Sequence, residues 1–192
     1  MSAIRGSSQY RKSSFLLDAA GERVLPSFLQ MLERPHLPAA LASSPFDGEG
    51  VATRDRDLVK DGMLTGYVLG SYSARKLGLR TTGNAGGIHN LMVSGGAAAP
   101  DLEGLFRQMG EGLYVTELMG QGVNGVTGDY SRGATGFWIT GGARGPAVQE
   151  ITIAGNLRQM YRDVVAVGSD VDTQGAIRTG SVLVDGLTIA GN

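Results

Sequence analysis

Glycine is the residue that most constrains this chain. It accounts for 31 of 192 residues, about 16% against an average near 7%, and it follows no collagen-like period. Because these glycines lie within apolar segments, they indicate tight turns, bulges and close backbone approaches rather than disorder. Apolar residues make up 42% of the chain, which is enough to fill one core. We therefore expect one globular domain over residues 1–192.

The apolar patterns between the glycines predict an α+β fold that is sheet-rich, with mainly antiparallel strands and hairpins and about three short helices. Asp-Gly pairs at 61–62 and 185–186 stand between strand-like runs and predict two hairpins, and residues 14–26 read as strand, turn, strand. Capping residues and apolar spacing predict helices over residues 71–78, 101–110 and 156–164. Further strands are predicted over residues 113–118, 134–140, 148–155 and 180–185.

Charge and composition exclude several classes of function. Seventeen basic and eighteen acidic residues leave a net charge of -1, so no bulk field favours nucleic acid or a membrane surface. No apolar run approaches the ~18 residues that cross a bilayer, and the N-terminus has no export-signal core. The absence of cysteine excludes disulfides, thiolate catalysis and cysteine-bound zinc in this chain. We predict a cytoplasmic chain without nucleic-acid or membrane partners.

The N-terminal run at residues 4–14 is polar and basic, and a strand-like run follows it abruptly. This predicts a fragment of a longer chain whose preceding helix ends near residues 2–4, and a frayed natural terminus is the alternative. If an upstream element is missing, uncovered apolar surface would favour self-association.

A G-x-G-x-x-G pattern occurs at Gly120, Gly122 and Gly125. With this much glycine the pattern is expected by chance about 0.8 times in the chain, so it carries little information. A dinucleotide loop also runs from a strand into a helix, and the residues after Gly125 do not begin a helix. We predict that these glycines allow close backbone packing and hold no phosphate.

The two histidines offer little catalytic chemistry. His36 lies between prolines, whereas His89 lies beside Asn90 and close to three glycines, where its imidazole could donate to a bound carbonyl; a structural role is the alternative. The histidines are 53 positions apart in a chain without H-E-x-x-H, so they do not predict a zinc site. No catalytic or metal-binding residue is predicted.

The block Asp129, Tyr130, Ser131 and Arg132 combines a turn residue, an aromatic ring and a guanidinium, and a glycine-flattened strand leads on to residue 138. Such a strand edge suits an extended peptide, which hydrogen-bonds along its backbone. The alternative is that Asp129 and Arg132 pair across a turn. The candidates for a peptide cleft are His89, Asn90, Asp129, Tyr130, Ser131 and Arg132.

Several long segments, in order along nearly the whole chain, resemble the C-terminal domain of the TldD/PmbA family on its PmbA (also called TldE) side. They are IRGSSQYRKSSFLLD, LASSPFDGEGV, SYSARKLGLRTTGNAGGIHN, TELMGQGVNGVTGDYSRGATGFW, EITIAGNL and GSVLVDGLTIAG.

The resemblance implies a cytosolic zinc metallopeptidase built as a TldD–TldE heterodimer, acting on small or unfolded peptides and historically named a modulator of DNA gyrase. In the family, the catalytic TldD-type subunit has an H-E-x-x-x-H helix just upstream of this region and a cysteine ligand near the C-terminus. That cysteine position falls at Thr179, a poor zinc ligand.

The resemblance therefore implies a non-catalytic PmbA/TldE-type domain that shapes a peptide cleft, with no cofactor of its own and with zinc in a TldD-type partner. One alternative is a pure assembly domain without substrate contact. The other is an active homodimeric metallopeptidase completed by a missing upstream segment.

Overall fold

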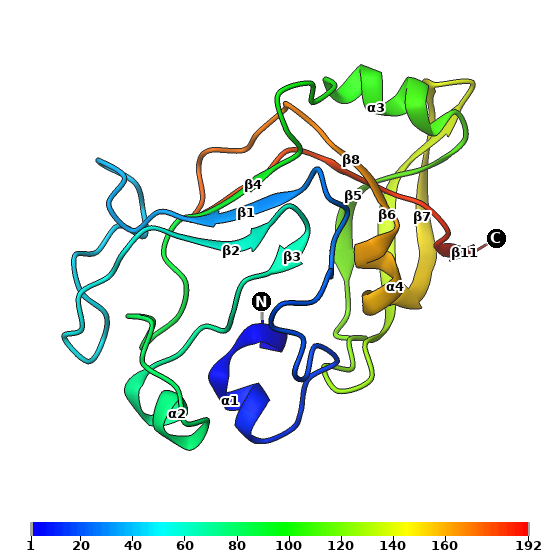
Figure 1. Cartoon of the computed structure of the whole chain (residues 1–192). Helices are drawn as coiled ribbons and strands as arrows, with labels where there is room; N and C mark the ends of the chain where they lie inside the picture. The colour runs from blue at the N-terminus through cyan, green and yellow to red at the C-terminus, as the bar shows by residue number, and fades with distance from the viewer. Residues whose placement is uncertain (1, 192) are drawn as a thin grey trace.

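A computed structural model describes residues 2–191 and confirms a sheet-rich α+β fold with short helices (Figure 1). The helices are the 3-10 helix η1 (Ser2–Ile4) and the α-helices α1 (Gly6–Tyr10), α2 (Ser71–Lys76), α3 (Leu102–Met109) and α4 (Leu157–Arg162). The strands are β1 (Gln30–Glu33), β2 (Arg56–Lys60), β3 (Met63–Leu64), β4 (Leu91–Ser94), β5 (Gly112–Met119), β6 (Asp129–Thr140), β7 (Ala143–Asn156), β8 (Val164–Val167), β9 (Ile177–Arg178), β10 (Val182–Val184) and β11 (Thr188–Ala190).

The strands form three sheets that are mainly antiparallel, as predicted. The five-stranded sheet has the order β3-β2-β1-β4-β9, and only its β4–β9 pair is parallel. The four-stranded sheet has the order β11-β7-β6-β5, and β8 pairs with β10. The hairpin between β2 and β3 turns at Asp61 and Gly62, whose φ angles of 51° and 75° are those that an Asp-Gly turn supplies.

The second predicted hairpin is wrong. Val182–Val184 pair with β8, whereas Thr188–Ala190 pair with β7, so the turn at Asp185 and Gly186 passes the chain from one sheet to another. An Asp-Gly pair fixes the local backbone, but the partner of each flanking strand is decided by packing elsewhere in the molecule.

The predicted strands within residues 14–26 are also absent, because this segment consists of turns. Its apolar side chains, among them Phe15 and Leu16, are buried in the core, but the backbone of this segment is not part of a β-sheet. Ser14 replaces part of the missing pairing: its hydroxyl donates to the Ala3 carbonyl at 2.7 Å and accepts from the Leu16 N–H at 2.9 Å.

The three predicted helices are present, and α3 and α4 have the caps that the sequence indicated. Asp101 accepts from Gly104 N–H at 2.7 Å before α3, and Gly110 ends that helix with φ at 71°. Asn156 caps α4, which ends at Arg162 because Val164 begins β8. Helix α1 was not predicted, since its polar residues show no apolar period and Arg5 makes no capping bond.

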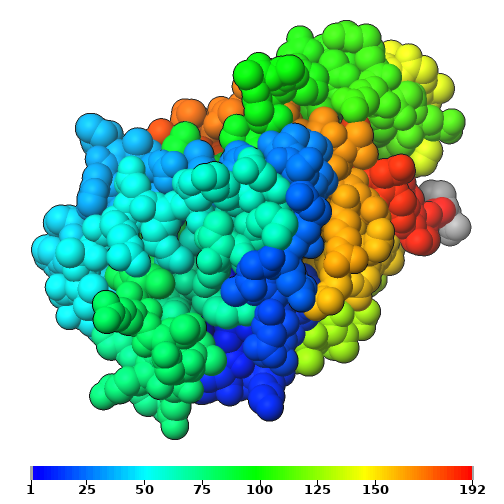
Figure 2. All heavy atoms as spheres, in the orientation of Figure 1, coloured from blue at the N-terminus to red at the C-terminus, as the bar shows by residue number. Residues whose placement is uncertain are grey.

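The main core lies beside the five-stranded sheet and draws on both ends of the chain. Ala3, Ile4 and Phe15 pack in it together with Leu58 of β2 and Val167 of β8. Figure 2 shows the N-terminal segment, in blue, between the residues of the first sheet and the C-terminal half of the chain. The four-stranded sheet has a small core of its own and leaves much of β7 exposed.

Candidate functional site

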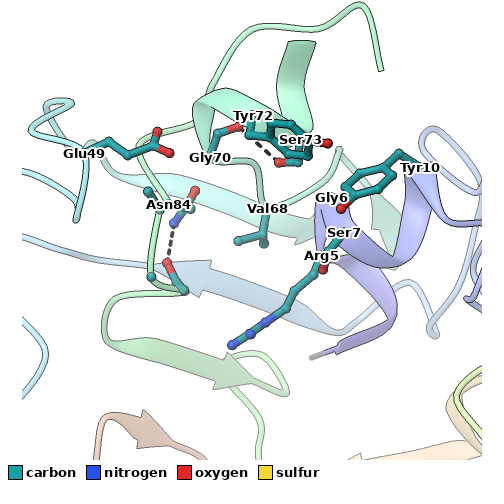
Figure 3. Close-up of a pocket in the computed structure, with 13 residues that line it drawn as sticks. Arg5, Gly6, Ser7, Tyr10, Glu49, Val68, Gly70, Tyr72, Ser73 and Asn84 are labelled. Carbon is teal, nitrogen blue, oxygen red and sulfur yellow. Dashed lines mark hydrogen bonds between the residues drawn. The ribbon is translucent and has the colours of Figure 1, made fainter. Parts of the chain in front are cut away.

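A polar pocket of about 310 Å³ opens between α1, α2 and the loop of residues 84–87 (Figure 3). Arg5 and Tyr10 line it from the α1 side, and Tyr72 and Ser73 line it from α2. The loop closes its other wall with Asn84 and the two glycines that follow Ala85. Sequence reasoning missed this pocket, because its walls come from three segments far apart along the chain.

Charges of opposite sign lie in the pocket walls. The Arg5 guanidinium makes no hydrogen bond or ion pair within residues 2–191 and lies beside Gly87, where a Cβ would be 3.5 Å from its Nη2 atom. Glu49 contributes a carboxylate whose Oε2 accepts from the Ser71 N–H at 2.8 Å. The pocket can therefore bind both an anionic and a cationic group.

A buried polar cluster supports the pocket floor. Glu33 is 1% exposed, and its Oε1 accepts from Asn84 Nδ2 at 2.6 Å and from the His89 N–H at 2.8 Å. Asn84 Nδ2 also donates to the Gly87 carbonyl at 3.0 Å, while its Oδ1 accepts from Arg56 Nη1 at 2.7 Å. The loop under the pocket is thus held by a buried carboxylate, an amide and a guanidinium.

The second oxygen of Glu33 has no hydrogen-bond partner within residues 2–191; Arg56 Nη1 is 3.9 Å away from it. Burial lowers the pKa of Arg56, and the nearby Glu33 carboxylate opposes that shift. The sequence gives only a weak signal for the pair of Glu33 and Arg56: Glu33 ends the strand β1, and Arg56 begins the strand β2.

Asp47 ties the loop to the segment that carries Glu49. Its Oδ1 accepts from the N–H groups of Glu49 and Val51, and its Oδ2 accepts from that of Ala85, all at 2.9 Å. Burial alone would raise the pKa of Asp47, but these three hydrogen bonds outweigh it and hold the pKa below its usual value. Sequence reasoning did not single out Asp47.

The predicted site residues His89 and Asn90 lie beside this cluster. His89 Nδ1 is 3.2 Å from Glu33 Oε1, and 15% of its side chain is exposed. Asn90 is 1% exposed and accepts from the Ala42 N–H at 3.0 Å. Its amide also donates to the Arg34 carbonyl at 3.0 Å and to Ser43 Oγ at 2.8 Å. Asn90 therefore holds the long loop that follows β1.

The other four predicted residues, Asp129 to Arg132, begin β6 in the four-stranded sheet, so the structure does not bring them together with His89 and Asn90. Asp129 accepts from Thr127 Oγ1 at 2.6 Å instead of pairing with Arg132. Burial raises the pKa of Tyr130, and Arg132 opposes that shift. Ser131 is exposed, and its N–H donates to the Gly122 carbonyl at 2.7 Å.

The strand edge next to these residues is β5 rather than β6. Strand β6 pairs with β7 on one side and with β5 on the other, so its glycine-flattened part is central in the sheet. The outer side of β5 is unpaired in the described chain, and Arg132 reaches toward the carbonyls of Leu118 and Met119 at 3.4 Å. We call this outer side of Gly112–Met119 the β5 edge.

The G-x-G-x-x-G segment connects β5 to β6 and begins no helix, as predicted. Gly120 adopts φ of 80°, and a Cβ on Gly122 would lie 1.7 Å from the Ser131 carbonyl oxygen. These two positions require glycine for backbone reasons, whereas Gly125 has open space around it.

The residues of this chain do not fit a zinc ion. Within residues 2–191, no three His, Cys, Asp or Glu side chains gather as a metal site would require. His36 Nε2 is 3.0 Å from Thr53 Oγ1, and His89 faces Glu33. Thr179 Oγ1 donates to the Gly180 carbonyl at 2.9 Å. The available donors are dispersed and hydrogen-bonded to other groups, so we derive no chemical step through a metal here.

None of the helices in residues 2–191 has the length and apolar character needed to cross a membrane.

Comparisons with known proteins identify the family of this domain. Residues 1–191 match the model of the PmbA/TldA metallopeptidase C-terminal domain. The chain is 56% identical over 189 residues to metalloprotease PmbA of Escherichia coli O157:H7, covering 98% of this chain and 42% of that protein. It is 54% identical over 194 residues to a metalloprotease PmbA homolog of Haemophilus influenzae, with coverages of 99% and 42%.

Solved structures share the fold over the whole chain. A Bacteroides thetaiotaomicron protein described as a candidate modulator of DNA gyrase is 32% identical, with a TM-score of 0.92, and the match covers 100% of this chain and 43% of that one. TldE from Thermococcus kodakarensis is 24% identical with a TM-score of 0.85, and the match covers 99% and 46%. The chain thus spans less than half the length of the proteins that it resembles.

Proposed function

The chain belongs to the PmbA/TldA metallopeptidase C-terminal domain family, and from that premise we propose that it acts as a non-catalytic PmbA (TldE)-type domain. Its partner would be a TldD-type subunit that holds zinc, and the pair would cleave small or unfolded peptides. The observation that carries the non-catalytic role is the donor set: threonine stands at position 179, and both histidines are hydrogen-bonded within the chain.

The β5 edge supports the peptide-binding part of the proposal. The outer side of this eight-residue strand is unpaired in the described chain, so its backbone N–H and C=O groups are available to an extended peptide. Leu118 and Met119 at its end are 40% and 42% exposed, and Val123 in the next loop is 45% exposed. These side chains would accept the apolar residues that an unfolded peptide displays.

The six predicted cleft residues divide into two roles in this proposal. Asp129, Tyr130, Ser131 and Arg132 lie next to the end of the β5 edge, where Arg132 would orient the peptide backbone. His89 and Asn90 would act from the other sheet, by fixing the loops beside the buried Glu33 cluster.

A pure assembly domain is the second candidate, and the exposure of β7 favours it. No residue of β7 belongs to the main core, and from Ala143 to Glu150 every residue except Val148 is exposed. A sheet with so little cover within the described chain is suited to contact with another subunit.

Zinc binding and peptide cleavage test the non-catalytic role. Calorimetric zinc titration should give no stoichiometric binding for this chain alone and binding for its mixture with a TldD-type subunit, and only the mixture should cleave an unfolded peptide. Stoichiometric zinc binding with cleavage by the chain alone would refute the proposal and favour an active homodimer.

The double substitution Arg132→Ala with His89→Ala separates the two candidates. The peptide-binding proposal expects weaker peptide binding with an intact heterodimer, whereas loss of the heterodimer supports the assembly candidate. Arg54→Ala is the matched control, because Arg54 is exposed and lies just before β2, away from the four-stranded sheet. It should change neither property.

A further inference from the structure

The pocket between α1, α2 and the loop of residues 84–87 is separate from the strand edge to which peptide binding was assigned above. It lies beside the five-stranded sheet, whereas the β5 edge belongs to the four-stranded sheet. Its volume of about 310 Å³ is near the lower end of the range for small-ligand pockets. Its size and the two charged side chains in its mixed polar and apolar lining point to a small, charged ligand.

Arg5 provides the anion-binding group. Arg5 is exposed, and its guanidinium is not paired with any carboxylate within residues 2–191; Figure 3 shows its side chain passing Val68 along one wall of the pocket. The absence of a side chain at Gly87 leaves room beside Nη2. A planar guanidinium with adjacent donors matches a carboxylate in a two-point hydrogen bond.

Glu49 provides the opposite charge from the far side of Asn84, as Figure 3 shows. One of its oxygens accepts from Ser71 N–H, and the other, Oε1, accepts no hydrogen bond within the described chain. That oxygen is available to an ammonium group. Because the backbone of Glu49 is bonded to Asp47, which also binds Ala85, its wall and the loop wall are fixed relative to each other.

Two aromatic rings complete the pocket. Tyr10 and Tyr72 make an edge-to-face pair with ring centroids 5.8 Å apart, and Tyr72 is 55% exposed. Ser73 lies beside them, with its hydroxyl donating to the Gly70 carbonyl at 3.1 Å. The rings give the pocket an aromatic surface on the side of α1 and α2.

We propose that this pocket binds a free amino acid or a dipeptide as its zwitterion. The α-carboxylate binds Arg5, the ammonium binds Glu49, and the side chain packs against Tyr10 and Tyr72. A dipeptide is too short to form a strand ladder along the β5 edge, so this binding is independent of the peptide-binding role proposed above.

Calorimetry with alanyl-tyrosine and its blocked forms tests the proposal on this chain. The free dipeptide should bind, and its C-terminal amide should bind at least about tenfold more weakly, since a charge-assisted pair is lost. Arg5→Gln should remove that preference for the free acid. N-acetylation should weaken binding to the wild type and have little effect on the Glu49→Gln variant, which keeps an oxygen for Ser71 N–H.

Arg80→Gln is the matched control, because Arg80 is exposed and does not line the pocket. It should bind alanyl-tyrosine as the wild type does, and urea unfolding should confirm that all variants are folded. Equal binding of the acid and the amide, or no binding of the free dipeptide at about 10 mM, overturns the proposal. Neither result affects the zinc and cleavage test above, so the two proposals fail separately.

Discussion

Substitutions of Asp47 should distinguish the loss of all three of its hydrogen bonds from the loss of only one. Its three hydrogen bonds use the two carboxylate oxygens unequally, with Glu49 and Val51 on Oδ1 and Ala85 on Oδ2. Asp47→Ala removes all three acceptors, whereas Asp47→Asn can keep the two on Oδ1 and places an NH₂ group against the Ala85 N–H. The two variants should therefore differ in stability.

Hydrogen bonds to a charged group contribute about 1.5–3 kcal/mol each, and some of the freed N–H groups can reach water. We expect Asp47→Ala to lower the free energy of unfolding by about 3–5 kcal/mol and Asp47→Asn by about 1–3 kcal/mol. For a chain of this size the melting temperature falls roughly 2–4 °C per kcal/mol. Urea unfolding at neutral pH measures both free energies.

The pH dependence gives a second test of Asp47. Since its folded-state pKa lies below the ordinary value of 3.8, the stabilisation is present above that value and is lost as the pH falls through the folded-state pKa. The difference between wild type and Asp47→Asn should therefore shrink in strong acid. Equal destabilisation by alanine and asparagine, or a loss below about 1 kcal/mol for alanine, would refute the reasoning.

Three further substitutions, one of them with a matched control in the same strand, test the fold. Gly136→Ala would place a Cβ 1.9 Å from the Tyr114 carbonyl oxygen, so we expect a loss of more than about 2 kcal/mol in urea unfolding, whereas Gly133→Ala in the same strand meets only ordinary contacts and should change stability by under about 1 kcal/mol. Asn90→Ala removes a buried amide with three hydrogen bonds and should cost about 2–4 kcal/mol; a loss under about 1 kcal/mol would contradict its role. Burial raises the pKa of Tyr161, so stability is intact below its unfolded-state pKa near 10 and is lost as the pH rises above it. Tyr161→Phe should flatten that alkaline decline, and an unchanged slope would contradict it.

Local signals in the sequence predicted the elements whose geometry depends on neighbouring residues. Asp101 and Gly110 bracket α3 because a side-chain cap and a left-handed glycine act within one turn of the helix. Asp61 and Gly62 likewise formed the predicted turn between adjacent strands. The same reasoning was wrong for Asp185 and Gly186, where the two flanking strands find partners in different sheets.

The pocket could not be predicted because its chemistry depends on distant pairs. Glu33 accepts from Asn84 and His89, which follow it by 51 and 56 positions, and nothing in the local sequence links them. The glycines near His89 did indicate a close backbone approach, and the structure has a buried carboxylate there. The free strand edge also could not be predicted. It belongs to β5 rather than β6 because of the order of strands in the sheet, and the sequence of one strand does not determine that order.

Val164 and Val167 lie in the main core and β9 joins the five-stranded sheet, and this arrangement has a consequence for synthesis of the chain. Strand β9 adds to a sheet whose other strands end by residue 94, and the two valines belong to the same core cluster as Ala3 and Ile4. Contacts between such distant residues form slowly, because a long loop must close before they stabilise anything. During translation, Ala3 and Ile4 are therefore made long before Val164 and Val167, and we expect the segment around them to depend on chaperones in that interval.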